Sequence, residues 1–160
     1  MQWEITLEER SLSDFSAEET RLRRAAVEAA GRAYAPYSGF QVGAAALLAG
    51  GGIVTGNNQE NAAYPSGLCA ERVALFYAGA TYPRVAVRKL AIVAQDGAGI
   101  RERISPCGAC RQVLLETEQR QGEPIEVWLC GREKAIVFPS AASLLPLCFG
   151  EADLKAEGAR

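Results

Sequence analysis

The first part of the chain carries apolar residues that recur with the 3.6-residue period of a helix. The positions that form this stripe are Leu22, Ala25, Ala26, Ala29 and Ala33. Ser16 and Glu19 stand three residues apart just before the stripe, which is the spacing of a helix capping box. The pattern therefore predicts a helix from Ser16 to about Ala35, where Pro36 stops it.

Short apolar runs typical of strands follow this helix. Five of them are predicted strands: residues 40–49 (FQVGAAALLA), 53–58 (IVTGNN), 89–95 (KLAIVAQ), 125–131 (IEVWLCG) and 135–140 (AIVFPS). The three glycines at 50–52 make the first two runs a hairpin. The last part of the chain, around Pro146, predicts only short helical or irregular structure.

Two further helices are predicted between the strands, and each begins in a segment that contains cysteine. Residues 69–80 (CAERVALFYAGA) predict a partly buried helix that ends at Gly79. Its apolar positions are Val73, Ala74, Phe76 and Tyr77. The next helix has Ser105 as its N-cap and Pro106 as its first helical residue, and Gly122 closes it.

These elements predict an α/β fold of three α/β/α layers, in which one mixed five-stranded sheet has helices on both faces. The chain has 160 residues, of which 49% are hydrophobic and 22% are charged. That length and composition suit one globular domain with its own core. We expect a single domain over residues 1–160, with residues 1–12 as an N-terminal extension.

Charge and hydropathy exclude several classes of protein. A net charge of −2 argues against nucleic-acid binding, which needs a basic face, so we interpret the arginines within residues 21–32 as a solvated helix face. The apolar runs fall short of the roughly 20 residues that span a bilayer. The acidic N-terminus has no apolar segment typical of a signal peptide. We therefore expect a cytoplasmic protein that binds neither nucleic acid nor membrane.

The chain contains no histidine, and this excludes much catalytic chemistry. It can form no Ser-His-Asp or Cys-His relay, no H-E-x-x-H zinc site and no 2-His-1-carboxylate iron site. Five cysteines, an odd number, favour reduced thiols or thiolate ligands over a disulfide framework. Any bound metal must therefore use Cys, Asp or Glu.

Three of the cysteines have the spacing of a metal site. Cys107 and Cys110 are three residues apart at a predicted helix start, so both sulfurs point the same way. Taken alone, this C-x-x-C pair also fits a thioredoxin-like redox pair or two core cysteines. Cys69 stands at the start of another predicted helix, and helix N-termini favour the thiolate form that zinc binds. Two facing helix N-termini would therefore bring all three sulfurs to one zinc ion.

Charged residues stand directly beside these cysteines. If water is the fourth zinc ligand, Glu71 is a general acid–base beside the metal, and otherwise it only stabilises the helix N-terminus. Arg72 and Arg111 each follow a predicted ligand and either hydrogen-bond the sulfurs or lie on the surface. Cys130 and Cys148 lie in apolar runs, which predicts small buried residues, although either of them could close a structural zinc site.

The motifs around these residues resemble those of a known family. The segments CAER and PCGACRQ look like the small, homotetrameric class of cytidine deaminases, in which Cys replaces the His of the H-x-E…P-C-x-x-C motif. The similarity runs from AYAPYSGFQVGAA through NNQENAAY to LLPLCFGEADL and leaves out the first 12 residues. It implies a cytidine deaminase-like fold with one Zn²⁺ per chain on Cys69, Cys107 and Cys110, and Glu71 as the proton shuttle.

The resemblance also implies the substrate contacts and the assembly. Asn58 and Glu60 would bind the ribose hydroxyls, and Phe40 would line the nucleoside pocket. The main-chain carbonyl of Ala70 would accept a hydrogen bond from the exocyclic amine of the base. Phe149 would reach into the active site of a neighbouring subunit in a homotetramer. Without the resemblance, the two phenylalanines would be interpreted as core residues.

The implied reaction is the hydrolytic deamination of cytidine and deoxycytidine to uridine and deoxyuridine, with release of ammonia, in pyrimidine salvage. One alternative is a deaminase of another aminopyrimidine nucleoside, such as a cytosine-nucleoside antibiotic. The others are a non-catalytic structural zinc module and a C-x-x-C thiol oxidoreductase. Gln59 stands where the family often has an aliphatic residue, but no proposed chemical step involves it.

Overall fold

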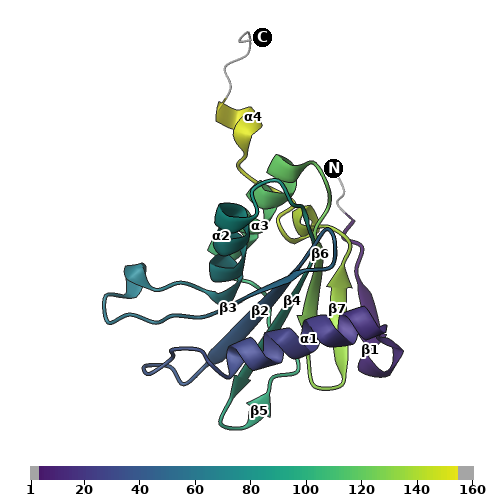
Figure 1. Ribbon diagram of the computed structural model, residues 1–160. Coiled ribbons are helices and arrows are strands. Elements are labelled where there is room, and N and C mark those ends of the chain that lie inside the picture. The colour runs from purple at the N-terminus through teal and green to yellow at the C-terminus, as the bar shows by residue number, and fades with distance from the viewer. Residues whose placement is uncertain (1–3, 155–160) are drawn as a thin grey trace.

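Figure 1 shows a computed structural model that describes residues 4–154. The strands are β1 (Glu8–Ser11), β2 (Gln41–Leu48), β3 (Ile53–Asn57), β4 (Val87–Asp96), β5 (Gly99–Ile100), β6 (Glu126–Cys130) and β7 (Lys134–Phe138). The α-helices are α1 (Ala17–Ala30), α2 (Ala70–Thr81), α3 (Gly108–Gln121) and α4 (Glu151–Leu154). Within the described residues, no helix is both long and apolar enough to cross a membrane.

All of these strands belong to one mixed sheet, in the order β1-β7-β6-β4-β2-β3, with β5 paired to the end of β4. The parallel pair is β4 and β6, and α3 provides the crossover between them. The predicted α/β class and mixed sheet are confirmed, but the prediction of five strands is wrong because the sheet has seven. The sequence of β5 has only two residues, and β1 is a polar edge strand, EERS, so neither has the apolar run that predicts a strand.

Helices cover both faces of the sheet, which confirms the three-layer arrangement (Figure 1). On one face, α1 packs through Leu22 and Ala26 into a core that contains Trp128. On the other face, α2 and α3 pack through Ala74 and Leu114 into a larger apolar core. The sheet therefore separates two cores, and the N-termini of α2 and α3 belong to the same side.

Two glycines of the β2–β3 hairpin let the helices lie directly against the sheet. A Cβ atom on Gly43 would overlap the main chain of α1 at Ala26 and Ala30. A Cβ atom on Gly56 would overlap the main chain of α2 at Ala70. The close approach at Gly56 fixes the start of α2, and therefore the neighbouring Cys69, over β3.

The first helix is shorter than its apolar pattern predicts, because it ends at Ala30 instead of about Ala35. The predicted capping box is present, with Ser16 and Glu19 each bonded to the main chain of the other. Beyond the helix, Tyr34 N donates to Asn58 O and Tyr34 O accepts from Glu60 N. These long-range hydrogen bonds hold Tyr34 in an extended conformation, so the helix ends before it reaches Pro36.

The boundaries of α2 also differ from the prediction. Gly79 lies inside this helix, which continues to Thr81, and a Cβ atom on it would lie 3.2 Å from Arg120 Nη2 of α3. The buried side chains of α2 include Ala74, Leu75 and Ala78. Phe76 and Tyr77, two of the apolar positions from which this helix was predicted, are 51% and 54% exposed because they lie away from the buried face.

The third helix begins two residues later than predicted. Cys107, not Ser105, is its N-cap residue, because the first helical hydrogen bond runs from Arg111 N to Cys107 O. Pro106 precedes the cap and disfavours helical geometry at Ser105. Gly122 closes the helix in a left-handed conformation, as predicted.

Candidate metal centre and active site

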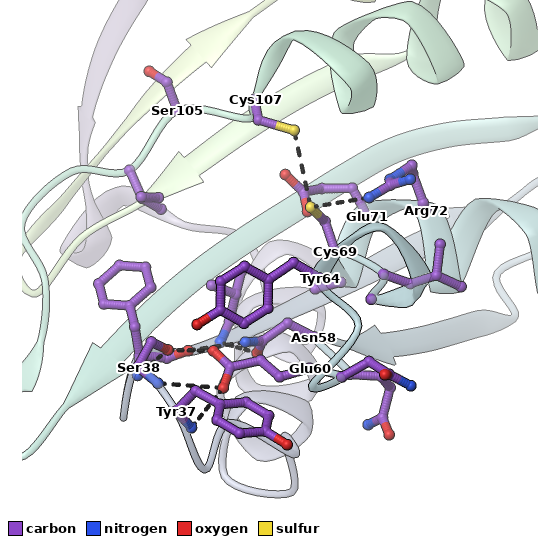
Figure 2. A pocket seen from close by; sticks show the side chains of 18 residues that line it. Tyr37, Ser38, Asn58, Glu60, Tyr64, Cys69, Glu71, Arg72, Ser105 and Cys107 are labelled. Atoms are coloured by element: carbon purple, nitrogen blue, oxygen red, sulfur yellow. Dashed lines mark hydrogen bonds between the residues drawn. The ribbon is translucent and has the colours of Figure 1, made fainter.

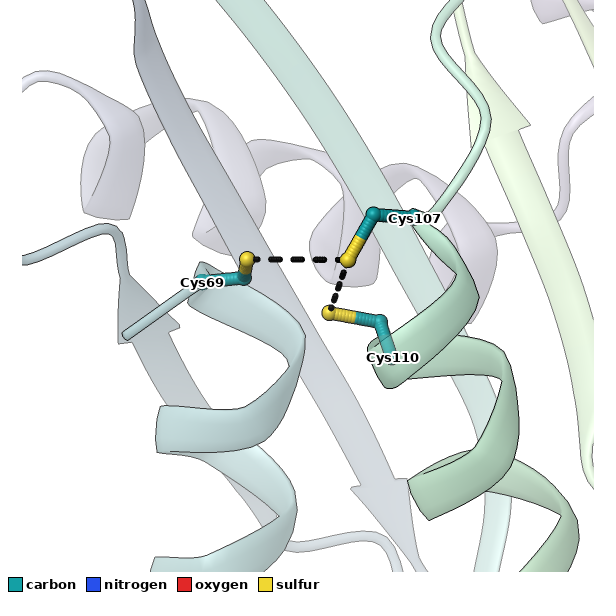
Figure 3. A group of neighbouring side chains, drawn as sticks. All are labelled: Cys69, Cys107 and Cys110. Atoms are coloured by element: carbon teal, nitrogen blue, oxygen red, sulfur yellow. Dashed lines mark hydrogen bonds between the residues drawn. The ribbon is translucent and has the colours of Figure 1, made fainter. Parts of the chain in front are cut away.

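The three predicted ligand cysteines meet at the N-termini of two helices (Figure 3). Cys69 is the N-cap residue of α2, Cys107 is the N-cap residue of α3, and Cys110 lies in the first turn of α3. The Sγ atoms of Cys69 and Cys107 are 3.9 Å apart, and those of Cys107 and Cys110 are 3.5 Å apart. The two helix starts therefore face each other, as the sequence predicts.

The spacing of the sulfurs fits a zinc ion. A tetrahedral zinc ion with Zn–S bonds of about 2.3 Å holds its sulfur ligands about 3.8 Å apart. The three Sγ atoms all lie within 4.8 Å of one another, and no further acidic or cysteine ligand atom joins this group within residues 4–154. Three protein ligands leave the fourth position open, which is the arrangement of catalytic zinc sites.

The other two cysteines lie away from this group. Cys130 is 1% exposed and belongs to the core on the α1 face of the sheet, and its burial raises the pKa of its thiol to about 12. Its prediction as a small buried residue is confirmed. The same prediction for Cys148 is wrong, because this residue is exposed. Its neighbours Leu147 and Phe149 are also 78% and 58% exposed, so the segment lies on the surface of the single chain.

Arg72 provides positive charge at the sulfurs. Its Nη2 atom donates a hydrogen bond to Cys69 Sγ at 3.4 Å. A hydrogen bond with Cys110 lowers the pKa of Cys69, burial opposes this effect, and Arg72 lowers the pKa further, to about 5. The hydrogen bond with Cys69 and burial raise the pKa of Cys110. Because three thiolates on Zn²⁺ carry a net charge of −1, a cation that binds the sulfurs moderates the site.

Arg111 makes its hydrogen bonds to main-chain carbonyls instead. Its Nε atom donates to Pro106 O at 2.9 Å, and its Nη1 atom donates to Leu144 O at 3.2 Å. Of the two arginines that follow predicted ligands, only Arg72 therefore has a sulfur as its hydrogen-bond partner. Arg111 instead connects the start of α3 to the C-terminal part of the chain.

A cavity of about 640 Å³ opens beside the sulfurs (Figure 2). Eight of the predicted site residues line it: Phe40, Asn58, Glu60, Cys69, Ala70, Glu71, Arg72 and Cys107. They come from the loop before β2, from the segment after β3 and from the N-termini of α2 and α3. Cys110 is fully buried behind this lining.

Glu71 is a buried carboxyl group at the metal end of the cavity. Its side chain lies beside Cys69 in the first turn of α2, and the residue is 4% exposed (Figure 2). Burial raises the pKa of Glu71, and the charge of Cys69 raises it further. A buried carboxyl group that opens onto the cavity beside a metal site can accept and return protons.

Asn58 lies in the wall of the cavity and joins it to β2. Its Oδ1 atom accepts a hydrogen bond from Val42 N at 2.7 Å, and its Nδ2 atom donates one to Phe40 O at 2.9 Å. Each end of this carboxamide still has one unused hydrogen-bonding position. Asn58 therefore holds the backbone of Phe40 in place and keeps the capacity to bind a hydroxyl group.

Glu60 faces the same cavity and binds the loop before β2 (Figure 2). Its carboxylate accepts hydrogen bonds from Ser38 Oγ, from Tyr37 N at 2.9 Å and from Ser38 N at 3.3 Å. The Ser38 hydroxyl group is the largest of the influences that lower the pKa of Glu60. No local sequence signal points to Tyr37 and Ser38, because they stand 23 and 22 positions before Glu60 in the chain.

Phe149 lies outside the cavity of its own chain. Its side chain is 58% exposed, which excludes core burial in the described chain. It follows η3 (Ala141–Leu144) in the exposed segment that leads to α4.

Three thiols at paired helix N-termini, with a buried carboxyl group in the wall of the adjoining cavity, suit zinc-assisted hydrolysis, in which water takes the fourth position on the metal. The chain matches the family described as "Cytidine and deoxycytidylate deaminase zinc-binding region" over residues 16–121. That match covers well over half of the chain, and the chain therefore belongs to this deaminase family. Its cofactor is zinc, and the three cysteines are the group that fits it.

Known proteins of similar sequence and structure agree with this assignment. The cytidine deaminase of Halalkalibacterium halodurans is 39% identical over 133 residues, which is 83% of this chain and 95% of the relative. That of Sporosarcina psychrophila is 43% identical over 123 residues, 77% of this chain and 85% of the relative. The crystal structure of cytidine deaminase from Burkholderia pseudomallei superposes with a TM-score of 0.70 at 41% identity, covering 81% of this chain and 98% of that one.

Proposed function

We propose that this protein deaminates cytidine and deoxycytidine hydrolytically, as an enzyme of pyrimidine salvage. One water is consumed and one ammonia is released for each uridine or deoxyuridine formed. The observation that carries the proposal is that one cavity is lined by Cys69, Cys107 and Glu71 at the metal site, with Cys110 buried just behind them, and also by Asn58 and Glu60. The family membership and the similar cytidine deaminases support the same reaction.

The metal end of the cavity performs the chemistry. When bound by the three cysteines, zinc supplies a Lewis acid that lowers the pKa of a water molecule. Glu71 would accept one proton from the attacking water and deliver it to N3 of the base. It would then take the second proton of the same oxygen as the C4=O bond forms and deliver it to the amine, so that the C4–N bond breaks and ammonia leaves. The main-chain carbonyl of Ala70, at the start of α2, accepts a hydrogen bond from that amine. Arg72 holds Cys69 in place and offsets the charge of the thiolates.

The other end of the cavity binds the sugar. Glu60 is held as an acceptor by the loop at Tyr37 and Ser38, which suits it to accept a hydrogen bond from a ribose hydroxyl. Asn58 offers one remaining donor and one remaining acceptor position, and Phe40 packs against the nucleoside. The charged residues that line the cavity are Glu60, Glu71 and Arg72, and Arg72 already binds a sulfur. This distribution favours a free nucleoside over a phosphorylated or polymeric substrate.

Four chains share their active sites in this proposal. The exposed ring of Phe149 supplies a packing surface for the base in a neighbouring chain, which fits its distance from the cavity of its own chain. Mixing Glu71→Gln chains with Phe149→Ala chains should then restore activity after subunit exchange, because some sites regain both residues. No recovery despite verified exchange would show that each chain builds its site alone.

Thiolate ligands are stable in a reducing compartment, which supports the cytoplasm as the location of this protein.

The direct test is incubation of the zinc-loaded protein with cytidine while the cytosine absorbance is followed. Loss of that absorbance with equimolar release of ammonia is the expected result. A panel of deoxycytidine, cytosine, CMP and cytosine-nucleoside antibiotics then separates the proposed substrates from other aminopyrimidines. Turnover of an antibiotic alone, or no turnover of any nucleoside, would overturn the proposal.

A further inference from the structure

The C-terminal segment that carries Phe149 is held by the same helix that carries two of the metal ligands. Glu118 of α3 accepts hydrogen bonds from Ser140 Oγ at 2.6 Å and from Ala141 N at 2.7 Å. Arg111 Nη1 donates to Leu144 O at 3.2 Å. Side chains of α3 thus bind this segment at several points along its length.

The last of these points is Gln112. Its Nε2 atom donates to the main-chain carbonyl of Phe149 at 2.8 Å. For residues 146–149, all of them described, this is the single hydrogen bond of the segment. The side chains of Leu147 and Phe149 are largely exposed, so the bond holds the backbone of Phe149 where its ring has little cover in its own chain.

We propose that Gln112 is a positioning residue, which fixes Phe149 for use in the active site of a neighbouring chain. Gln112 stands two residues after Cys110 on the same helix, α3. The hydrogen bond from Gln112 therefore fixes the position of Phe149 relative to the metal ligands of its own chain. The inference rests on the proposed sharing of active sites. It adds that Gln112 acts on the neighbour's site through Phe149, and not on the metal site of its own chain.

A positioning role and a merely structural role of Gln112 can be distinguished by placing the substitution in one chain or the other of a mixed oligomer. In mixed oligomers, a Glu71→Gln chain donates Phe149, and a Phe149→Ala chain supplies the intact Glu71. Gln112→Ala placed in the donor chain should reduce the recovered kcat/KM roughly threefold, the effect of losing one hydrogen bond of ordinary strength, and by no more than the loss of the whole Phe149 ring. The same substitution placed in the acceptor chain should change the recovery less than twofold, because that chain has no Phe149 ring to position.

Matched variants distinguish the loss of this hydrogen bond from loss of folding or of zinc. Gln112→Glu keeps the size of the side chain but cannot donate to the carbonyl, so in the donor it should give at least the loss seen with alanine. Gln119→Ala is the control, because the Gln119 side chain also lies next to the C-terminal segment, at Gly150, but makes no hydrogen bond within the described residues. Zinc content per chain and circular dichroism should match in all of these variants.

Each outcome has a separate meaning. Loss from the donor position with zinc retained supports Gln112 as a positioning residue for Phe149. Equal loss from both positions, loss only from the acceptor, or no loss from either position would overturn it. Failure of the parent pair to recover, although the wild-type protein deaminates cytidine, would reject active-site sharing together with this role of Gln112. Absence of deamination by the wild-type protein would instead reject the proposed function.

Discussion

At the scale of single residues, the proposed chemistry depends on Glu71, which is buried beside the sulfurs at the wall of the cavity. Glu71→Gln keeps the shape and hydrogen-bonding capacity of the side chain but cannot transfer protons. We expect kcat to fall by roughly 10² to 10⁴-fold while zinc content and the free energy of unfolding remain close to wild type. Steady-state kinetics and metal analysis of the same preparation test this expectation, and near-normal turnover would remove Glu71 from the mechanism.

The cysteines differ in what their removal should do. Cys107→Ala leaves two sulfurs, which form an incomplete site, so we expect loss of both zinc and activity. Cys148→Ser is the matched control, because Cys148 is exposed and lies outside the group of three sulfurs. It should retain one zinc per chain by elemental analysis. Full zinc occupancy in Cys107→Ala would mean that the ligand set is misassigned.

At the scale of secondary-structure elements, Glu19 joins β1, α1 and β4. The residue is 8% exposed and accepts hydrogen bonds from Ser16 N at 2.8 Å, Arg10 Nη1 at 3.1 Å and Lys89 Nζ at 3.2 Å. Burial alone would raise the pKa of Glu19, but the bonds from Ser16, Arg10 and Lys89 outweigh it and lower the pKa to about 2. The ionised carboxylate therefore stabilises the junction of the polar edge strand with the core of the sheet.

Because Glu19 is ionised in these contacts, we expect the free energy of unfolding to depend on pH. Because the folded-state pKa of Glu19 is lowered from 4.5 to about 2, its contribution is present above the unfolded-state pKa and is lost as the pH falls through about 2. Glu19→Gln should lower the free energy of unfolding by on the order of 2 kcal/mol at pH 7. Urea unfolding at a series of pH values should show the difference from wild type shrinking below about pH 4.5.

The control for this prediction is Glu28→Gln on the same helix. Glu28 forms an ion pair with Arg24 at 3.8 Å, and both side chains are more than 60% exposed. An exposed pair of this kind contributes little to stability, so the variant should unfold like the wild type. A difference for Glu19→Gln that stayed constant across the whole pH series would contradict the proposed role of its charge.

At the scale of the whole molecule, the activity should depend on assembly. Phe149→Ala removes an exposed ring that is proposed to pack against the base in a neighbouring chain. We expect kcat/KM to fall roughly fivefold or more with no loss of zinc, from the loss of an aromatic packing surface. Leu154→Ala, which removes a 74% exposed side chain from the following helix α4, should retain wild-type kinetics.

Size-exclusion chromatography combined with activity measurements completes this test. The wild-type protein should elute as a tetramer, and conditions that dissociate it to monomers should abolish most of the turnover. A monomer with full activity would show that one chain supplies every residue of its own site.

The sequence alone predicted a candidate metal site, because the signals for its ligands are local. The spacing of Cys107 and Cys110, the signals for helix starts and the absence of histidine lead to a three-cysteine metal site without any knowledge of the fold. Periodicity also predicted the hairpin, the central strands and the three main helices, since each of these carries an apolar pattern of its own. It could not predict β1 or β5, which form because an existing edge or strand end offers them a partner.

Only the tertiary structure decided which distant residues meet. The sulfurs of Cys69 and Cys107 are 38 residues apart in sequence, and packing of both helices on one face of the sheet brings them to 3.9 Å. The same packing gives Glu60 its partners Tyr37 and Ser38, and gives the backbone of Phe149 its partner Gln112. Exposure to solvent also depends on the tertiary structure. The apolar residues around Cys148 predict burial, but Leu147, Cys148 and Phe149 are exposed. The partners and the burial of a side chain depend on the elements that surround it in space, and the local pattern of apolar and polar residues does not specify them.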